Sequence, residues 1–90
     1  MAEMAVAEIK NELGLHARAA AQFVQTASKF TANVTVAKDG EEVNGKSILS
    51  LMMLAAPIGS EIEITTEGED AAQLLQHLLD LIENKFGEPR

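Results

Sequence analysis

The chain has no cysteine, no tryptophan and no tyrosine, and its only aromatic residues are three phenylalanines. Without cysteine, neither a disulfide framework nor a thiolate site can form. With so few aromatic rings, a hydrophobic core must be built from aliphatic side chains. A chain of 90 residues is long enough for one such core and too short for two. We therefore expect a single domain over residues 1–90.

Basic residues are also scarce, since seven Lys and Arg stand against 14 Asp and Glu and give a formal net charge of -7. This balance argues against nucleic-acid binding, where a basic face supplies most of the affinity. No apolar run approaches the roughly 18 residues of a membrane span, and the first residues do not resemble a signal peptide. We expect a cytoplasmic protein with no nucleic-acid partner and no membrane insertion.

The sequence has two histidines, His16 and His77, which lie far apart along the chain. No group of His, Asp and Glu has the spacing of metal ligands, so we expect no metal site. The carboxylates between residues 61 and 70 fall on a predicted strand and a helix start. There they indicate a solvated edge and a favourable helix dipole rather than acid–base catalysis.

His16 lies where a polar loop gives way to a helical pattern. The loop ends on Gly14, which permits a tight approach, and the apolar residues that follow predict an amphipathic helix running to about Lys29. The first N–H groups of a helix lack internal partners, and the helix dipole makes this end electropositive. An anion on His16 would be stabilised there, and Arg18 could reach it. From spacing alone, a capping histidine and a solvated arginine remain the commoner interpretations.

Alternating apolar residues predict four strands, and the dipeptide Asp39-Gly40 predicts a type I′ hairpin between the second and the third. On the first strand, Ala5, Ala7 and Ile9 are expected to face the core. The strands are predicted at residues 4–9, 34–37, 41–44 and 61–66, and the helices from the His16 loop to about 29, over 48–54, and from 71 to a stop at Gly87. This pattern predicts an α+β fold: an open-faced two-layer sandwich in which a four-stranded antiparallel sheet is covered on one face by three helices, in the order β-α-β-β-α-β-α.

Two residues are predicted to cap helices through their side chains, Ser47 before the short helix and Asp70 before the last one. The short helix is apolar nearly all round, and a domain of this size cannot bury both of its faces. Part of it should therefore be an exposed docking surface, although a tightly packed core helix is an equally good interpretation. His77 falls outside the apolar stripe of the last helix, so we expect it to be solvated.

Short motifs spread over nearly the whole chain occur in the order of one known family. They are Gly-Leu-His-Ala-Arg at 14–18, Phe-Val at 23–24, Val-Asn-Gly-Lys-Ser-Ile at 43–48, Leu-Met at 51–52, Gly59, and Phe-Gly-Glu at 86–88. The chain thus resembles the HPr family of histidine-containing phosphocarrier proteins, which belong to the bacterial phosphoenolpyruvate-dependent phosphotransferase system. The family fold is the sandwich predicted above.

The resemblance implies a role for each matching residue. His16 would accept a phosphoryl group on Nδ1 from phosphorylated enzyme I and pass it to sugar-specific or regulatory acceptors, and Arg18 would steady the phosphate. Ser47 matches the serine that a dedicated kinase phosphorylates in many bacteria. The partner-docking surface would comprise Ile48, Leu49 and Met52. The resemblance implies a stoichiometric carrier without a cofactor, and we expect a monomer.

The chain departs from the family in two places. The family usually has proline directly after the arginine, and here that residue is Ala19. Alanine is a good helix former, so the helix should survive, but the loop could be looser. The first helix also carries Gln22, Gln25 and Ser28 where many relatives have lysine, which could shift partner affinity.

Two other functional classes compete with the carrier. A regulatory binding module would act through Ser47 and the apolar residues after it, in carbon or nitrogen signalling, although His16 and Arg18 argue against a purely regulatory role. An independent enzyme is the weakest interpretation, because no second acid–base group accompanies His16.

Overall fold

The computed structural model describes residues 1–90, and its four strands form one antiparallel sheet in the order β1-β4-β2-β3. β4 (Glu61–Glu67) pairs on one side with β1 (Ala2–Glu8) and on the other with β2 (Asn33–Lys38). β2 pairs in turn with β3 (Glu41–Asn44), which forms the far edge. The two strands that are adjacent in the chain, β2 and β3, are joined by the predicted hairpin, with positive φ at both Asp39 and Gly40.

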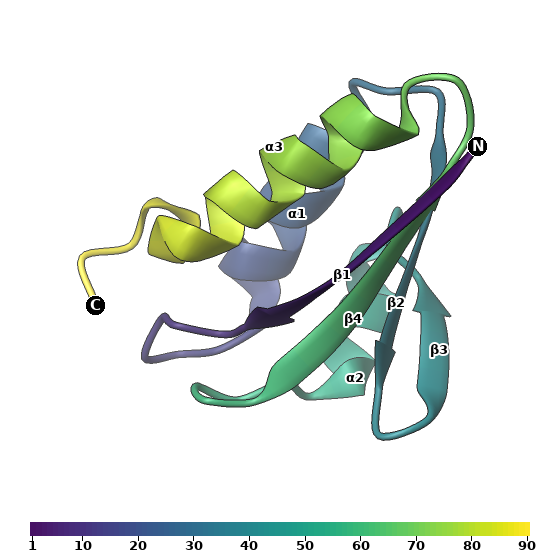
Figure 1. The fold of residues 1–90 in the computed structure, drawn as a ribbon. Coiled ribbons are helices and arrows are strands. Elements are labelled where there is room, and N and C mark those ends of the chain that lie inside the picture. The colour runs from purple at the N-terminus through teal and green to yellow at the C-terminus, as the bar shows by residue number, and fades with distance from the viewer.

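The helices α1 (Ala17–Ala27), α2 (Ile48–Leu54) and α3 (Ala71–Glu83) all lie on one face of this sheet, as Figure 1 shows. A short 3-10 turn, η1 (Lys85–Gly87), follows α3. The α+β open-faced sandwich and the element order are therefore confirmed. None of the helices is both long and apolar enough to cross a membrane.

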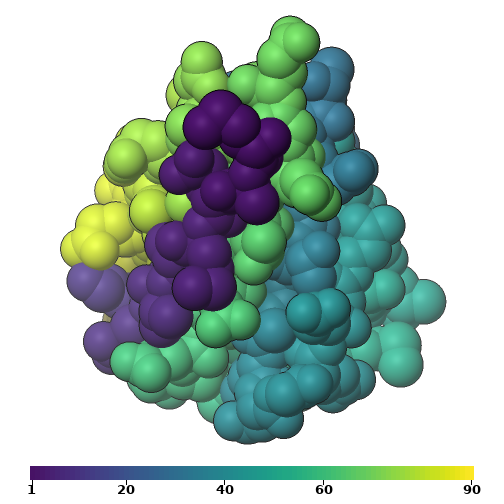
Figure 2. Space-filling view, turned by 45° about the vertical axis from the view of Figure 1, so that its right-hand side comes forward, coloured from purple at the N-terminus to yellow at the C-terminus, as the bar shows by residue number.

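The core lies between the sheet and the helices and is aliphatic apart from two phenylalanines, Phe23 and Phe86. Along β1 the predicted alternation holds, since Ala5 and Ala7 pack against the core while Met4 and Val6 are exposed on the other face. In Figure 2 the residues of β1 (purple), β4 (green), β2 (blue) and β3 (teal) lie side by side with no helix in front of them. The sheet thus has one buried face and one open face.

Some predicted boundaries were wrong. β1 begins at Ala2 because its first residue pairs with Glu67 of β4, and a partner strand sets a strand's length as much as its own residues do. α3 ends at Glu83 rather than at Gly87. The chain leaves the helix there with positive φ at Lys85 and Phe86, and this turn places the Phe86 ring in the core.

The predicted side-chain cap at Asp70 was also wrong. Its carboxylate makes no bond to the start of α3. It accepts instead from the backbone N–H groups of Thr31 (2.9 Å) and Ala32 (2.8 Å), in the connection between α1 and β2. The hydrogen bond from Thr31 N–H is the main reason that the pKa of Asp70 lies below its ordinary value. Asp70 therefore joins two connections that are distant in sequence.

Candidate functional site

The loop before α1 is held against the rest of the fold at Gly14 and Leu15. Gly14 has φ of 67°, and a Cβ atom at this position would lie 2.5 Å from the carbonyl oxygen of Ala56, so only glycine fits. The next residue, Leu15, is buried and donates its N–H to that same carbonyl at 2.9 Å. These contacts fix where residue 16 enters the helix.

His16 occupies the N-cap position of α1, as the sequence predicts. Its backbone is extended, with φ -81° and ψ -175°, and its carbonyl accepts the first helical bond from Ala20 N–H at 2.8 Å. Its side chain makes no capping hydrogen bond. The N–H groups of Ala17, Arg18 and Ala19 precede that first bond and are left without helical acceptors. The start of α1 is therefore an open set of donors beside the imidazole ring.

The two ring nitrogens of His16 have different surroundings. Nε2 lies 2.5 Å from Oε2 of Glu88, whereas Nδ1 takes part in no hydrogen bond within the chain. The imidazole side chain is 28% exposed and that of Glu88 only 7%. A carboxylate can only accept a hydrogen bond, so this contact favours the neutral tautomer with hydrogen on Nε2 and the lone pair on Nδ1.

Glu88 is itself held by Asn11, which is completely buried. The Asn11 amide donates to Oε1 of Glu88 at 3.0 Å and to the carbonyl of Gly14 at 2.7 Å. Burial raises the pKa of Glu88, but the hydrogen bonds from His16 and Asn11, together with the positive charge of Arg18, outweigh it. The pKa of Glu88 therefore lies below its ordinary value.

Sequence reasoning gave no role to Glu88 or Asn11, although Glu88 stood in one of the matching motifs. The contact between residues 16 and 88 spans 72 positions, and no periodic or local signal in a sequence reports such a pair. Figure 1 shows how the fold brings them together, because the end of the chain returns to the loop between β1 and α1. The backbone bond from Glu12 N–H to the Arg90 carbonyl, at 3.0 Å, fixes that return.

An open pocket of about 510 Å³ lies over this site and is lined by Glu12, Leu13, residues 16–18 and residues 88–90. Arg18 is exposed at its rim and forms no ion pair or hydrogen bond through its side chain, so its guanidinium is available to a ligand. A larger hollow, of about 880 Å³, lies elsewhere and contains neither histidine. The geometry thus brings His16 and Arg18 to one pocket that admits an anion.

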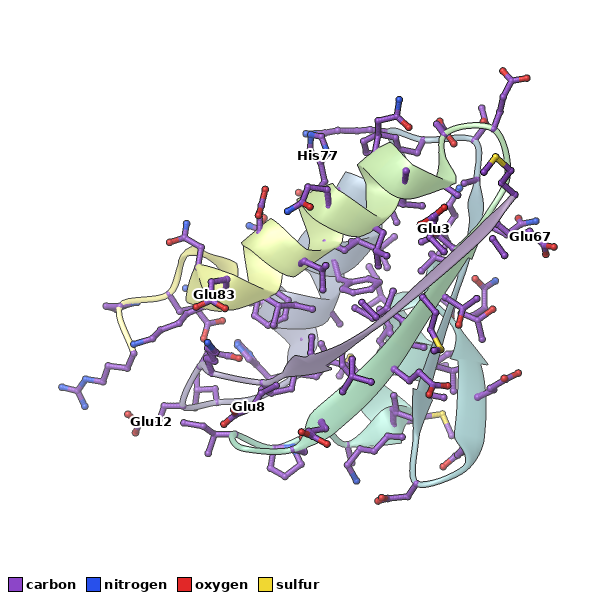
Figure 3. The ribbon with its side chains drawn as sticks, viewed as in Figure 1. Glu3, Glu8, Glu12, Glu67, His77 and Glu83 are labelled. Atoms are coloured by element: carbon purple, nitrogen blue, oxygen red, sulfur yellow. The ribbon has the colours of Figure 1, made fainter.

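His77 has none of these features. It is exposed on α3, its Nδ1 lies 2.8 Å from the carbonyl of Gln73, and its ring packs on Phe30 with 5.0 Å between centroids. Figure 3 shows it on the outer side of α3, far from Glu12 at the loop beside the first histidine. The prediction of a solvated residue is confirmed.

Ser47 caps α2 as predicted, since its Oγ accepts from Ser50 N–H at 3.2 Å. Leu51 and Leu54 on the inner side of α2 are buried. On its outer side, Ile48, Leu49 and Met52 are 41%, 67% and 40% exposed. The prediction that the short helix exposes part of its apolar surface is therefore confirmed. The predicted docking surface did not include Leu13, Met53 and Ile58, which are also exposed.

Comparison with known proteins agrees with this geometry. A family model described as "PTS HPr component phosphorylation site" matches residues 5–84. The phosphocarrier protein HPr of Neisseria meningitidis serogroup A is 56% identical over 81 residues, which cover 90% of this chain and 91% of that protein. The HPr-like protein Crh of Halalkalibacterium halodurans is 46% identical over 78 residues, covering 87% and 93%. The crystal structure of HPr-C-His from Thermoanaerobacter tengcongensis superposes with a TM-score of 0.94 at 48% identity, covering 98% and 99% of the two chains.

Proposed function

Because the chain belongs to the HPr family of phosphocarrier proteins of the phosphotransferase system, we propose that His16 accepts a phosphoryl group from phosphorylated enzyme I and passes it to sugar-specific or regulatory acceptor proteins. The observation that carries the proposal is the position of the His16 ring at the open start of α1, with Nδ1 unpaired and Nε2 held by Glu88. In this proposal the chain acts as a one-domain monomeric carrier in the cytoplasm.

The chemistry asks little of the carrier beyond position and charge. The Nδ1 lone pair attacks phosphorus, and the bond between phosphorus and the donor atom breaks. Phosphoryl transfer depends mainly on alignment and on neutralising the oxygens of the transferred group. The free N–H groups of residues 17–19 and the guanidinium of Arg18 supply that neutralisation.

The same proposal assigns a partner surface and a control point. Ile48, Leu49 and Met52 are exposed on the outer side of α2 and would dock enzyme I and the acceptors. Ser47 lies beside them, so a phosphate placed there by a kinase would put about two negative charges at the edge of that apolar surface. Phosphorylation of Ser47 would then weaken docking without touching His16.

The test is incubation of the purified chain with phosphoenolpyruvate and enzyme I from the same organism. We expect one phosphoryl group per chain, labile in acid and stable in base, as a phosphoramidate is, and ³¹P NMR together with peptide mapping should place it on His16. A phosphate that survives acid, or one found on His77, would contradict the proposal.

A second candidate is a mainly regulatory module, favoured by the exposed α2 surface and by the 46% identity to an HPr-like protein Crh. It differs from the carrier in one measurable respect. A regulatory module would bind its partner only when Ser47 is phosphorylated and would take up no phosphate from enzyme I. The incubation described above therefore separates the two functions.

A further inference from the structure

We propose that Glu88 is a positioning residue for phosphoryl transfer at His16: its carboxylate keeps the proton on Nε2 and so leaves the Nδ1 lone pair free to attack. This inference rests on the proposed function, and it adds a third side chain, from the far end of the chain, to His16 and Arg18. Asn11 takes part by holding the carboxylate in place.

The contact between Glu88 and His16 differs from the ion pairs that lysine and arginine form in the molecule. Lys10–Glu83, Lys38–Asp39 and Arg90–Glu12 each have a strongly exposed carboxylate, with 72%, 84% and 61% of the acidic side chain accessible. Only the Glu88 carboxylate is enclosed, at 7%, and only it has a fully buried amide on its second oxygen. The groups of an exposed ion pair readily exchange their mutual hydrogen bond for hydrogen bonds to water. An enclosed carboxylate with a hydrogen bond on each oxygen keeps one orientation.

The fixed carboxylate decides which nitrogen can react. A neutral imidazole has one N–H and one lone pair, and the hydrogen bond made by one nitrogen sets the state of the other. An ionised carboxylate on Nε2 accepts only, so it favours the tautomer with hydrogen on Nε2. Without it, part of the population would carry the proton on Nδ1 and could not attack phosphorus until that proton had moved.

The carboxylate also offsets charge as the reaction proceeds. When the Nδ1–P bond forms, the electron pair of the broken bond leaves with the donor atom of enzyme I. The proton stays on Nε2, and the His16 ring becomes positively charged. Glu88 lies across the ring from the incoming phosphate, so it stabilises this positive charge without lying against the phosphate oxygens. Because the group is already in place, no reorganisation is needed during transfer.

The test uses ¹⁵N NMR of the two ring nitrogens of His16 in the unphosphorylated chain, together with the single-turnover rate of phosphoryl uptake from enzyme I. In the native protein the shifts should report the Nε2–H tautomer. Glu88→Ala should shift both ring nitrogens toward mixed tautomers and slow uptake by about 10-fold, as expected for losing one charge-assisted hydrogen bond. Affinity for enzyme I should be unchanged, because the substitution removes no exposed apolar surface.

Glu88→Gln separates geometry from charge. Its amide oxygen can still accept from Nε2, so the tautomer should persist while uptake is slowed less than in Glu88→Ala. The matched control is Glu83→Ala, since Glu83 is also paired with a basic side chain but lies outside the pocket, 72% exposed, and contacts Lys10 instead of the ring. Glu83→Ala should change neither the ¹⁵N chemical shifts of the ring nor the rate of uptake.

Two results would overturn the proposal: ¹⁵N chemical shifts of the ring in Glu88→Ala equal to those of the native chain, or a loss of rate in Glu83→Ala as large as in Glu88→Ala. If Glu88→Ala fails to fold, judged by its backbone ¹H–¹⁵N spectrum, native-like uptake by Glu88→Gln overturns the charge role instead. If the native chain takes up no phosphate at all, the proposed carrier function fails. The ¹⁵N chemical shifts of the His16 ring still decide whether Glu88 sets the tautomer.

Discussion

The starts of α1 and α2 share a backbone form and differ in what the first side chain does. His16 and Ser47 both have extended backbones, with φ of -81° and -116°. The Ser47 hydroxyl folds back and accepts from Ser50 N–H, so it satisfies one of the N–H donors that lack a partner within the helix. The His16 ring contacts Glu88 instead and accepts no hydrogen bond from the first N–H groups of α1.

This difference follows from how each helix is stabilised. α2 has seven residues and is too short to be stable alone, so a cap matters to it. α1 has 11 residues and buries Ala19, Ala20, Phe23 and Ala27 against the core, so packing holds it without a cap. An anion site at a helix start needs N–H donors without a partner in the protein. α1 can leave its first donors unpaired because core packing supplies its stability.

The largest effect should come from removing the nucleophile at the open helix start. His16→Gln should abolish acid-labile phosphate uptake from enzyme I, because the lone pair of an amide nitrogen is delocalised into the carbonyl group and does not attack phosphorus. His77→Gln is the control and should take up phosphate at the native rate. Residual uptake by His16→Gln, measured with labelled phosphoenolpyruvate, would place the nucleophile elsewhere.

The next effect should come from a charge at the capped helix start. Ser47→Asp should keep its melting temperature, since aspartate is also a good N-cap and suits the positive end of the dipole. Its uptake should fall by about 10-fold or more, because a charge beside Ile48 and Leu49 must be desolvated on docking. Ser47→Ala should behave in the opposite way and lose about 1 kcal/mol of stability while taking up phosphate normally. Normal uptake kinetics in Ser47→Asp would leave Ser47 as a cap alone.

A smaller effect is expected for the arginine at the pocket rim. Arg18→Ala should slow uptake by about 10-fold and leave the fold intact, since it removes charge-assisted contacts to phosphate but no core atoms. Arg18→Lys keeps the charge without the planar fork and should recover part of the rate. Equal rates for all three proteins in stopped-flow transfer assays would show that the helix donors suffice.

Local features of the sequence predicted the two helix starts well. The Ser47 cap, the position of His16 and the Asp39-Gly40 hairpin each depend on a few adjacent residues, and backbone sterics act over that range. The apolar alternation predicted which faces of the strands are buried, because its period of two is fixed by strand geometry. The resemblance to HPr supplied the expected role of His16 at the start of α1, which the spacing of the residues alone left open.

Side chains that act across the fold were predicted badly. Asp70 has the sequence context of a cap, but the fold brings Thr31 and Ala32 within its reach, and two backbone donors there replace the helix donors. Glu88 and Asn11 meet His16 only because the turn after α3 returns the chain to the β1–α1 loop. Such pairs depend on tertiary topology, which no local pattern records.

Asp70 provides a stability effect that should spare the transfer chemistry. Its folded pKa lies below the ordinary value of 3.8, mainly through the hydrogen bond from Thr31 N–H. The stabilisation is therefore present above about pH 4 and is lost as the pH falls through the folded pKa. Asp70→Asn should melt below the native protein at pH 7, by a margin that shrinks in acid, with uptake at His16 unchanged. Glu69→Gln, the neighbouring carboxylate, is the control, and a constant margin from pH 7 to pH 2 would contradict this account.

The smallest effect is expected where the chain departs from its family, at Ala19. This residue lies in the first turn of α1, and its N–H precedes the first helical bond, which Ala20 N–H makes to the His16 carbonyl at 2.8 Å. Ala19→Pro therefore removes no hydrogen bond and restricts the unfolded chain, so the free energy of unfolding should change by less than about 1 kcal/mol. Ala20→Pro, one residue later, breaks that bond and should cost about 3 kcal/mol. Urea titration compares the two directly. Equal losses would mean that the first turn of α1 has no room for the ring, since Ala19 is itself buried. Uptake by Ala19→Pro should stay near the native rate, because the N–H groups of Ala17 and Arg18 remain available to the phosphate.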